Sequence, residues 1–325
     1  MNRILLKIAS GIVLSFFTLT SCGSESNDIK EPGEGDNGGG GETSTVKPED
    51  VYEEIVFCGE KKAYIVNVAN SNRNDLDVVW EYDASTKPAP ISTHVAEFND
   101  CKSVNDNKEI LLTSAWGCLL IDRATQECLF YSDGIMGHSA ELLPGRRIVT
   151  ALSHALSGSD GDRIQLFEVG RNNELLWEHA LSEAHGVVWI EARQRLYAIG
   201  ATEIREYQLK DWETDKPSLE QVQTWMLPSE HGHDLSYISD NELGCTTNTN
   251  TYIFNIDTGT FEVYVPLQGR NGVKSFNYDK ETECALYTVQ TTEWWTQTIT
   301  FINPTKILDT TGYIERTYKV RPVRK

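Results

Sequence analysis

The chain has 325 residues, with 48 Asp and Glu against 29 Lys and Arg, and a formal net charge of −19 at pH 7. This excess of negative charge argues against nucleic acid and anionic membrane surfaces as partners, because long-range repulsion opposes both. It does not exclude an anionic sugar held by a local basic cluster.

The N-terminus has the order of residues that is typical of an exported bacterial lipoprotein. Arg3 and Lys7 precede an apolar run over 8–19, which is too short to span a bilayer as a mature helix. The run ends in the tetrapeptide LTSC, which resembles a lipobox and closes with Cys22. We therefore expect 1–21 to be a signal peptide and Cys22 to carry a lipid. A secretory signal with an unrelated cysteine is the alternative.

Residues 22–50 form an acidic, Gly-rich segment with almost no apolar side chain. Such a segment cannot bury enough surface to offset its ordering entropy, so we expect a flexible tether. Gly23 resembles the residue found at this position in lipoproteins sorted to the outer membrane, and 24–28 resemble the export tags of surface lipoproteins. These resemblances imply an outer-membrane protein, attached through its lipid alone, at the cell surface or, as the alternative, on the periplasmic face.

The remaining cysteines have no metal-type CxxC spacing, and most lie inside apolar runs. They are Cys58, Cys101, Cys118, Cys128, Cys245 and Cys284. Export permits disulfides, but Cys packs as a small hydrophobic residue, so we expect buried free thiols. The pair to test first is Cys118 with Cys128.

Residues 51–325 contain a repeat of short β-rich runs that predicts a propeller. Four units begin at 137–141, 184–187, 232–235 and 272–275. Each unit has a second strand about ten residues later, as expected for the blade of a propeller. Third and fourth strands follow, as over 163–169 and 175–179. A unit of about 40 to 48 residues with four strands is typical of a propeller blade.

Two earlier units, one opening at Asp100 and one over 55–82, raise the predicted number of blades to six. Single blades cannot bury both faces, so the blades must close into a ring. We expect closure to pair a terminal segment such as 313–320 with the blade at the other end. The predicted fold is an all-β six-bladed β-propeller. Seven blades are the alternative, because the first strand of the unit over 55–82 is hard to see.

Three aromatic elements carry a resemblance to known propellers. They are Trp80-Glu81-Tyr82, Trp177-Glu178-His179 and Val188-Trp189. These elements resemble the repeats of quinoprotein-like propellers, and the whole domain resembles an uncharacterised family of β-propeller lipoproteins from glycan-foraging Gram-negative bacteria. The resemblance implies the fold but brings no chemistry, so function must be argued from residues.

The candidate site lies at one end of the predicted central channel. His138, His185, His233 and Lys274 occupy nearly equivalent positions at the starts of four inner strands and should converge on the axis. Loops on the same face should bring His94, Trp116, His154, Glu203, His231, Asn248, Arg270 and Trp294 toward the mouth. The alternatives are that the histidines satisfy backbone groups at blade starts and that Trp294 packs between blades.

Aromatic side chains beside polar ones suit the binding of carbohydrate or another extracellular ligand. If the protein is an enzyme, we favour a polysaccharide lyase acting on acidic glycans. His138, His185 or His233 would be its base, and Lys274 or Arg270 would neutralise a uronate carboxylate. Several propeller lyases have a histidine-rich mouth that this one resembles.

Two other interpretations of the mouth stay open. The imidazoles of His138, His185 and His233 can approach from adjacent blades and hold a divalent metal, although no contiguous motif supports this. No other cofactor is expected. The mouth can also bind a glycan or a protein without catalysis, so the sequence does not decide whether the protein is an enzyme.

Overall fold

The computed structural model describes residues 47–154 and 161–323. The predicted signal peptide, Cys22 and all of the predicted tether except its last four residues lie outside these ranges. Lys47 precedes a short helix, α1 (Pro48–Val51), which contains the other three of these residues and whose Pro48 is buried. Among the described residues, no helix is long and apolar enough to cross a membrane.

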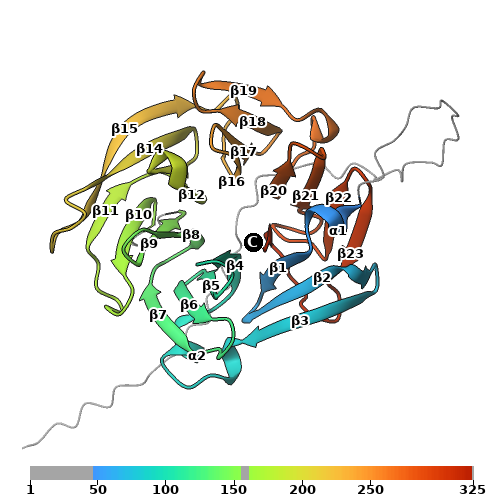
Figure 1. Cartoon of the computed structure of the whole chain (residues 1–325), viewed down its shortest axis with the longest axis horizontal. Coiled ribbons are helices and arrows are strands. Elements are labelled where there is room, and N and C mark those ends of the chain that lie inside the picture. The colour runs from blue at the N-terminus through green and yellow to red at the C-terminus, as the bar shows by residue number, and fades with distance from the viewer. Residues whose placement is uncertain (1–46, 155–160, 324–325) are drawn as a thin grey trace, which may run out of the picture. The chain divides into compact units, whose positions relative to one another are not determined.

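Six antiparallel four-stranded sheets stand around a central axis as the blades of a propeller (Figure 1). Blade 1 contains β1 (Glu54–Gly59), β2 (Lys62–Asn72), β3 (Asp75–Asp83) and β24 (Val320–Pro322). Blade 2 contains β4 (Phe98–Val104), β5 (Glu109–Ser114), β6 (Gly117–Asp122) and β7 (Cys128–Asp133). Blade 3 contains β8 (Gly137–Leu143), β9 (Arg147–Leu152), β10 (Arg163–Glu168) and β11 (Trp177–Ala180).

The other three blades take their strands in simple chain order. Blade 4 contains β12 (Gly186–Ile190), β13 (Arg195–Ile199), β14 (Glu203–Lys210) and β15 (Ser218–Met226). Blade 5 contains β16 (Asp234–Ser239), β17 (Glu242–Thr246), β18 (Thr251–Asn255) and β19 (Thr260–Val263). Blade 6 contains β20 (Val273–Asp279), β21 (Cys284–Val289), β22 (Thr298–Ile302) and β23 (Lys306–Asp309).

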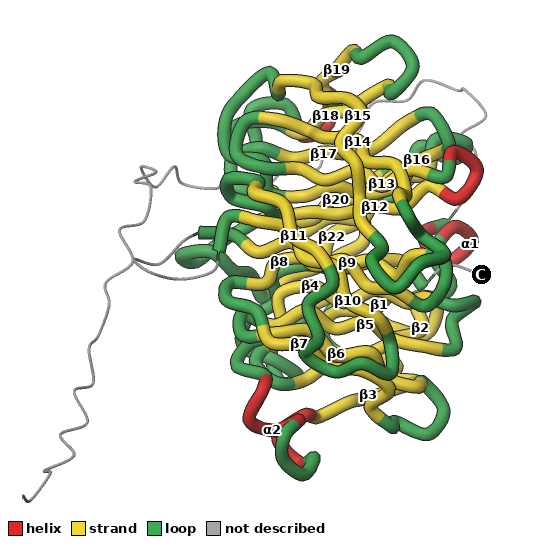
Figure 2. Tube along the Cα trace, turned by 90° about the vertical axis from the view of Figure 1, so that its left-hand side faces the viewer, coloured by secondary structure: helices red, strands yellow, loops and turns green. Residues whose placement is uncertain are grey.

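Helical structure is confined to short connections, and the loops lie at the two ends of the strands (Figure 2). The connections are η1 (Ala84–Thr86), α2 (Ile91–His94), η2 (Glu191–Arg193) and η3 (Val265–Leu267), and α1 precedes the first strand. The prediction of an all-β propeller with six blades is therefore confirmed, and the seven-bladed alternative is wrong.

The ring closes between the two ends of the described chain. The strand β24 forms the inner edge of blade 1, where Val320 pairs with Phe57 and Pro322 with Ile55. The described C-terminus accordingly lies near the axis (Figure 1). Closure through a terminal segment was predicted, but the segment 313–320 contributes only its last residue to the strand. The first strand of blade 1 is hard to see in 55–82 because it comes from the other end of the chain.

The core consists of apolar clusters between neighbouring blades, and β1 shows how the sequence builds them. Successive side chains of a strand point to opposite faces. Ile55 and Phe57 therefore pack with residues of blade 6, whereas Val56 and Cys58 pack with residues of blade 2. Inner strands are buried on both faces, which explains why they read as continuous apolar runs rather than as alternating ones.

The six described cysteines are free thiols, and all except the half-buried Cys128 are buried. Cys118 and Cys128 lie on the paired strands β6 and β7, but Cys118 is opposite Ser132 and Cys128 is opposite Ile121. Burial raises the pKa of the Cys128 thiol to about 11. The expectation of buried free thiols is therefore met without a disulfide between this pair.

Candidate functional site

A left-handed backbone residue precedes each of the four predicted channel residues. Met136, Glu183 and His231 have φ angles of 58°, 48° and 59°, and each lies two positions before a channel histidine. Gly272, with φ of 72°, has the same place before Lys274. A non-Gly residue in this conformation costs about 1 kcal/mol or more, and such residues gather at functional sites. The repeated turn gives the four blades a common way of directing a side chain to the axis.

The four side chains converge as the sequence predicted. The ring centroids of His138 and His185 are 4.3 Å apart, and those of His185 and His233 are 5.4 Å apart. The Nζ atom of Lys274 lies 3.1 Å from Nε2 of His233. We call His138, His185, His233 and Lys274 the histidine cluster, and the end of the channel that holds it the histidine end.

Two of the three imidazoles are held in the same way. Nδ1 of His138 lies 2.7 Å from the carbonyl oxygen of Met136, and Nδ1 of His185 lies 2.8 Å from that of Glu183. A carbonyl oxygen only accepts, so each Nδ1 carries the hydrogen and each neutral ring presents Nε2 as an acceptor. These two histidines thus satisfy a backbone group with one nitrogen and present the other as an acceptor.

His233 is held differently from the other two rings. Its Nε2 lies 2.6 Å from Oδ1 of Asn248, and its Nδ1 is buried without a hydrogen-bond partner among the described residues. A buried polar atom without a partner costs about 1 to 3 kcal/mol, so it calls for a physical explanation such as a bound water or ligand. This unsatisfied nitrogen adds to the strained turns as a sign of a site.

The histidine cluster is neutral apart from its lysine. Burial lowers the pKa of His138 to about 3, and it holds the pKa of His185 and of His233 well below the usual value. Neighbouring cations act in the same direction, with Lys274 the main one for His233. At neutral pH the cluster therefore combines hydrogen-bond acceptors with one ammonium group.

Tyr318 extends the site on the side of the closing strand. Its ring lies in edge contact with His138 at 5.8 Å and with Trp294 at 5.7 Å. The side chain is 4% exposed, and its hydroxyl has no hydrogen-bond partner among residues 47–154 and 161–323. Burial raises the pKa of this hydroxyl, so it stays protonated and can donate.

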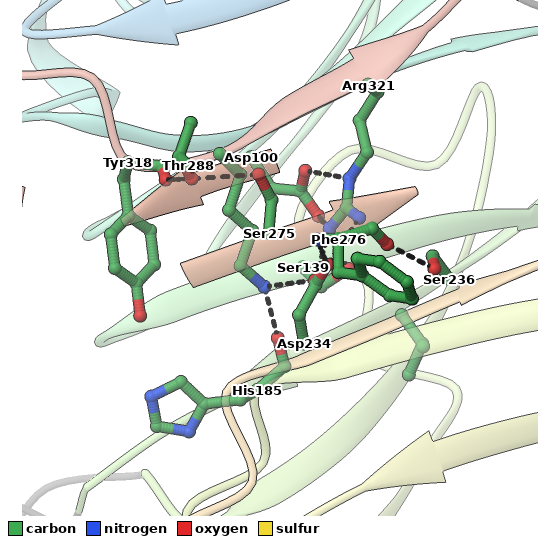
Figure 3. Close-up of polar contacts among 12 residues, drawn as sticks. Asp100, Ser139, His185, Asp234, Ser236, Ser275, Phe276, Thr288, Tyr318 and Arg321 are labelled. Carbon is green, nitrogen blue, oxygen red and sulfur yellow. Dashed lines mark hydrogen bonds and ion pairs between the residues drawn. The ribbon is translucent and has the colours of Figure 1, made fainter. Parts of the chain in front are cut away.

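A buried ion network lies next to the cluster and crosses the channel. Arg321 donates from Nε to Asp100 at 2.8 Å and from Nη2 to Asp234 at 2.6 Å. Lys319 lies 3.1 Å from the same Asp234 carboxylate and also donates to the carbonyl oxygen of His185 at 2.8 Å. Figure 3 shows the rings of Tyr318 and His185 extending away from the Arg321 guanidinium.

The network is the most completely buried charged group of the described chain, with Lys319 and Asp234 each 0% exposed. Burial alone would raise the pKa of Asp100, but Arg321 and Lys319 outweigh it and hold that pKa well below the usual value. Two carboxylates and two cations balance each other. The network therefore joins blades 2 and 5 to the closing strand without adding net charge.

The structure brings several predicted rim residues to the histidine cluster. The ring of His154 is 6.3 Å from that of His185, and Asn248 contacts His233 as described. Nδ1 of His231 lies 2.8 Å from Oε2 of Glu183, whose carbonyl holds His185. Trp294 reaches the site through an edge contact of its ring with the ring of Tyr318.

Trp116, Glu203 and Arg270 have other surroundings than the cluster. Trp116 lies on the same face, beside Met136 through the hydrogen bond from Met136 N to Ala115 O, and is 59% exposed. Glu203 is paired with Arg205, and Arg270 is an exposed residue after η3. His94 ends α2, which packs against β7 at the periphery of the ring, because a long connection carries the chain outward there (Figure 1).

A metal site was one interpretation of the three histidines. Among the described residues, no three His, Cys, Asp or Glu side chains are placed to hold a metal ion. His138 and His185 hold Nδ1 on backbone carbonyls, as histidines that bind metal through Nε2 commonly do, but Nε2 of His233 is taken by Asn248 and Lys274. The donor set as arranged does not fit a three-histidine metal centre.

Sequence reasoning missed Tyr318, Lys319 and Arg321, although all three reach the axis. The available signal was the alternation of Tyr318, Lys319, Val320 and Arg321 in a segment expected to close the ring. An inner strand with two basic residues needs buried carboxylates, and Asp100 and Asp234 at inner-strand positions could have been matched to them.

The family follows from comparison of the whole sequence. The model of a family of unknown function, DUF6528, matches residues 13–321. The chain belongs to this family. No curated protein matches it.

Two solved structures share the fold of this DUF6528 protein. A protein of unknown function from Bacteroides caccae has a TM-score of 0.57 at 12% identity, covering 84% of this chain and 100% of its own. The β-propeller domain of Cps50 (Swd1) from Myceliophteria thermophila has a TM-score of 0.51 at 10% identity, covering 75% of this chain and 78% of its own. At such identities the likeness shows the fold alone.

Proposed function

We propose that the histidine end of the channel binds the carboxylate-bearing sugars of an acidic glycan. The observation that carries the proposal is the convergence of three neutral imidazoles and one ammonium group in a single buried cluster. Lys274 offers positive charge to a carboxylate, while Nε2 of His138 and of His185 can accept hydrogen bonds from sugar hydroxyls. A cationic donor among neutral acceptors suits a uronate better than a neutral sugar or a phosphate.

Aromatic side chains complete the proposed binding surface. Trp294 stands beside Tyr318 at the cluster, and the exposed Trp116 lies on the same face. Aromatic rings next to polar groups favour sugars, because the apolar face of a pyranose packs on a ring while its hydroxyls are hydrogen-bonded. Tyr318 can donate its hydroxyl to the ligand.

The proposal includes display of the propeller at the cell surface. The support is in the sequence, where a lipobox-like tetrapeptide ends at Cys22 and an acidic Gly-rich segment follows. A flexible tether of about 28 residues extends roughly 30 Å by chain statistics. A propeller attached in this way to the outer membrane can present its histidine end to large external glycans.

Cleavage of the same ligand by β-elimination is the second candidate. It is favoured by the geometry of His185, whose Nδ1 is held by the carbonyl oxygen of Glu183, so that Nε2 of the ring can accept a proton. His185 would take the proton from the carbon next to the carboxylate, and a carbon–carbon double bond would form as the bond to the leaving oxygen breaks. Tyr318 would protonate that oxygen, and Lys274 would stabilise the charge that develops on the carboxylate.

Calorimetric titration with uronate oligosaccharides of defined linkage tests the binding proposal. Tetramers of galacturonate, guluronate and glucuronate-containing repeats serve as ligands, with neutral tetramers as controls. We expect one acidic tetramer to bind, and Lys274→Met to weaken that binding at least tenfold, about 1.4 kcal/mol. Binding that persists unchanged in Lys274→Met would contradict the proposal, as would the absence of any acidic ligand across the panel.

The elimination candidate has its own readout. Unsaturated uronates absorb at about 235 nm, so the tetramer that binds is incubated with the protein and followed at this wavelength. We expect His185→Asn to abolish the signal while affinity stays within about threefold, because a base acts in the transition state. Binding without any absorbance change would leave the protein a binding propeller and remove the lyase.

A further inference from the structure

A cavity lies at the opposite end of the channel from the histidine cluster. Its volume is ≈ 120 Å³, and it is lined by residues from the inner strands of all six blades, among them Lys102, Glu141, Trp189 and Asn277. Glu141 follows His138 by three positions on β8, so the two ends are about 10 Å apart along that strand. Arg321 lies between them, as part of the ion network. We call this space the far cavity.

The charges that line the far cavity are already balanced. Nζ of Lys102 lies 3.0 Å from Oε2 of Glu141, with side chains 13% and 16% exposed. Lys102 also donates to the carbonyl oxygen of Val187 at 2.6 Å, which fixes it across three blades. The guanidinium of Arg321 is engaged by Asp100 and Asp234. A ligand with net charge would find no uncompensated partner here, so the cavity favours a neutral molecule.

One polar side chain offers an acceptor at the wall of the far cavity. Asn277 is 2% exposed and donates through Nδ2 to the carbonyl oxygens of Val320 and Leu286. Its Oδ1 has no hydrogen-bond partner among the described residues, although the side chain lines the cavity. An amide oxygen has two lone pairs, so this oxygen at the cavity wall can accept a hydrogen bond from a hydroxyl.

Two anchored aromatic rings stand in the wall of the far cavity. Trp189 of blade 4 donates from Nε1 to Glu191 at 2.6 Å, and Tyr237 of blade 5 donates to Asp240 at 3.0 Å. Both polar tips are thus held by neighbours on their own strands or turns. Rigid rings beside a paired lysine and glutamate form the combination that binds a pyranose by its apolar face and its hydroxyls.

We infer that the far cavity binds one neutral sugar residue. A volume of ≈ 120 Å³ holds roughly eight to twelve water-sized spheres of about 10 to 15 Å³ each, and a hexose has twelve heavy atoms. The glutamate and lysine of the ion pair and the Asn277 oxygen meet its hydroxyls, and an aromatic ring packs on it. This site goes beyond the proposed function, because it takes a neutral ligand at the other face of the propeller.

Saturation-transfer NMR with methyl glycosides of glucose, galactose and mannose, each at about 10 mM to detect millimolar affinity, tests the inference. We expect one glycoside to bind, and Glu141→Gln, which keeps side-chain volume, to weaken it at least fivefold. Trp189→Leu provides a second variant on a different blade. Lys274→Met is the matched control at the histidine end and should leave this binding unchanged.

Two outcomes would overturn the inference. One is the absence of saturation transfer to all three glycosides. The other is binding that survives Glu141→Gln and Trp189→Leu in folded protein but is lost in Lys274→Met, which would place the neutral sugar at the histidine end. Failure of the acidic tetramers to bind leaves this test unaffected, so the two proposals can fail separately.

Discussion

The imidazole rings of His138 and His185 lie 4.3 Å apart, with the two side chains 9% and 5% exposed. Their pKa values are lowered by burial, so folding favours the neutral form. The contribution of these neutral rings to stability is fully present above the unfolded pKa of about 6.5. It is lost as the pH falls toward the pKa of the folded state.

Acid should therefore destabilise the propeller before its carboxylates titrate. Each histidine that stays neutral in the folded state lowers the free energy of unfolding by about 1.4 kcal/mol at pH 5.5 relative to pH 7.5. Urea unfolding at the two pH values measures the loss. His138→Asn should reduce the pH dependence, whereas a variant as pH-sensitive as the wild type would show that this ring is not held neutral.

Arg321→Met should destabilise the protein strongly. The change leaves the buried carboxylates of Asp100 and Asp234 with Lys319 as their main cation, and breaking a buried pair in this way costs about 3 to 5 kcal/mol. Thermal and urea unfolding provide the measurement. Lys62→Met removes an exposed cation 3.9 Å from Glu81 and should change stability by less than about 0.5 kcal/mol. Equal effects of the two changes would contradict the role given to the network.

Ending the chain at Lys319 should open the ring. This truncation removes β24, whose Val320 pairs with Phe57, and exposes the inner edge of blade 1. We expect a less cooperative unfolding transition and rapid proteolysis, because blades depend on their neighbours for burial. Limited proteolysis with mass spectrometry locates the first cuts. A truncated chain as resistant as the full one would show that closure does not depend on β24.

The cysteine thiols should be unreactive in the folded protein. Burial raises the pKa of Cys128 to about 11, and the other five described cysteines are fully buried. A thiolate reagent should therefore react slowly, at Cys128 first, and with all six only after unfolding. Reducing agent should leave the melting temperature unchanged. Rapid labelling of a buried cysteine, or a melting temperature lowered by reduction, would contradict this arrangement.

The propeller and its channel histidines could be predicted because they follow from local patterns. The inner strands β8 and β20 begin at or next to the predicted residues, since a turn, a polar channel residue and an apolar run recur in each blade. In four blades, the residue two positions before the channel residue has a left-handed backbone. This common turn points the four side chains in the same direction. Equivalent sequence positions therefore became neighbours in space.

The closing strand could not be placed as well, for two physical reasons. The strand β24 has three residues and contains a proline, which weakens any strand pattern. Lys319 and Arg321 also read as solvent-exposed, and only the long-range pairing with Asp100 and Asp234 makes their burial favourable. His94 was predicted at the channel mouth, but its helix lies at the periphery of the ring. The length of a loop alone does not say whether the loop returns to the axis.

The proposed role of the histidine cluster is tested most directly by NMR of its imidazole nitrogens. The ring signals of His138, His185 and His233 are assigned through single His→Asn variants and followed while a uronate tetramer is added at constant pH. We predict that these signals shift together and saturate with the acidic tetramer, because a carboxylate beside Lys274 changes the field at all three rings. The matched neutral tetramer should leave them in place. Imidazole signals that do not shift with any acidic tetramer, or that shift equally with the neutral tetramer, would contradict the account.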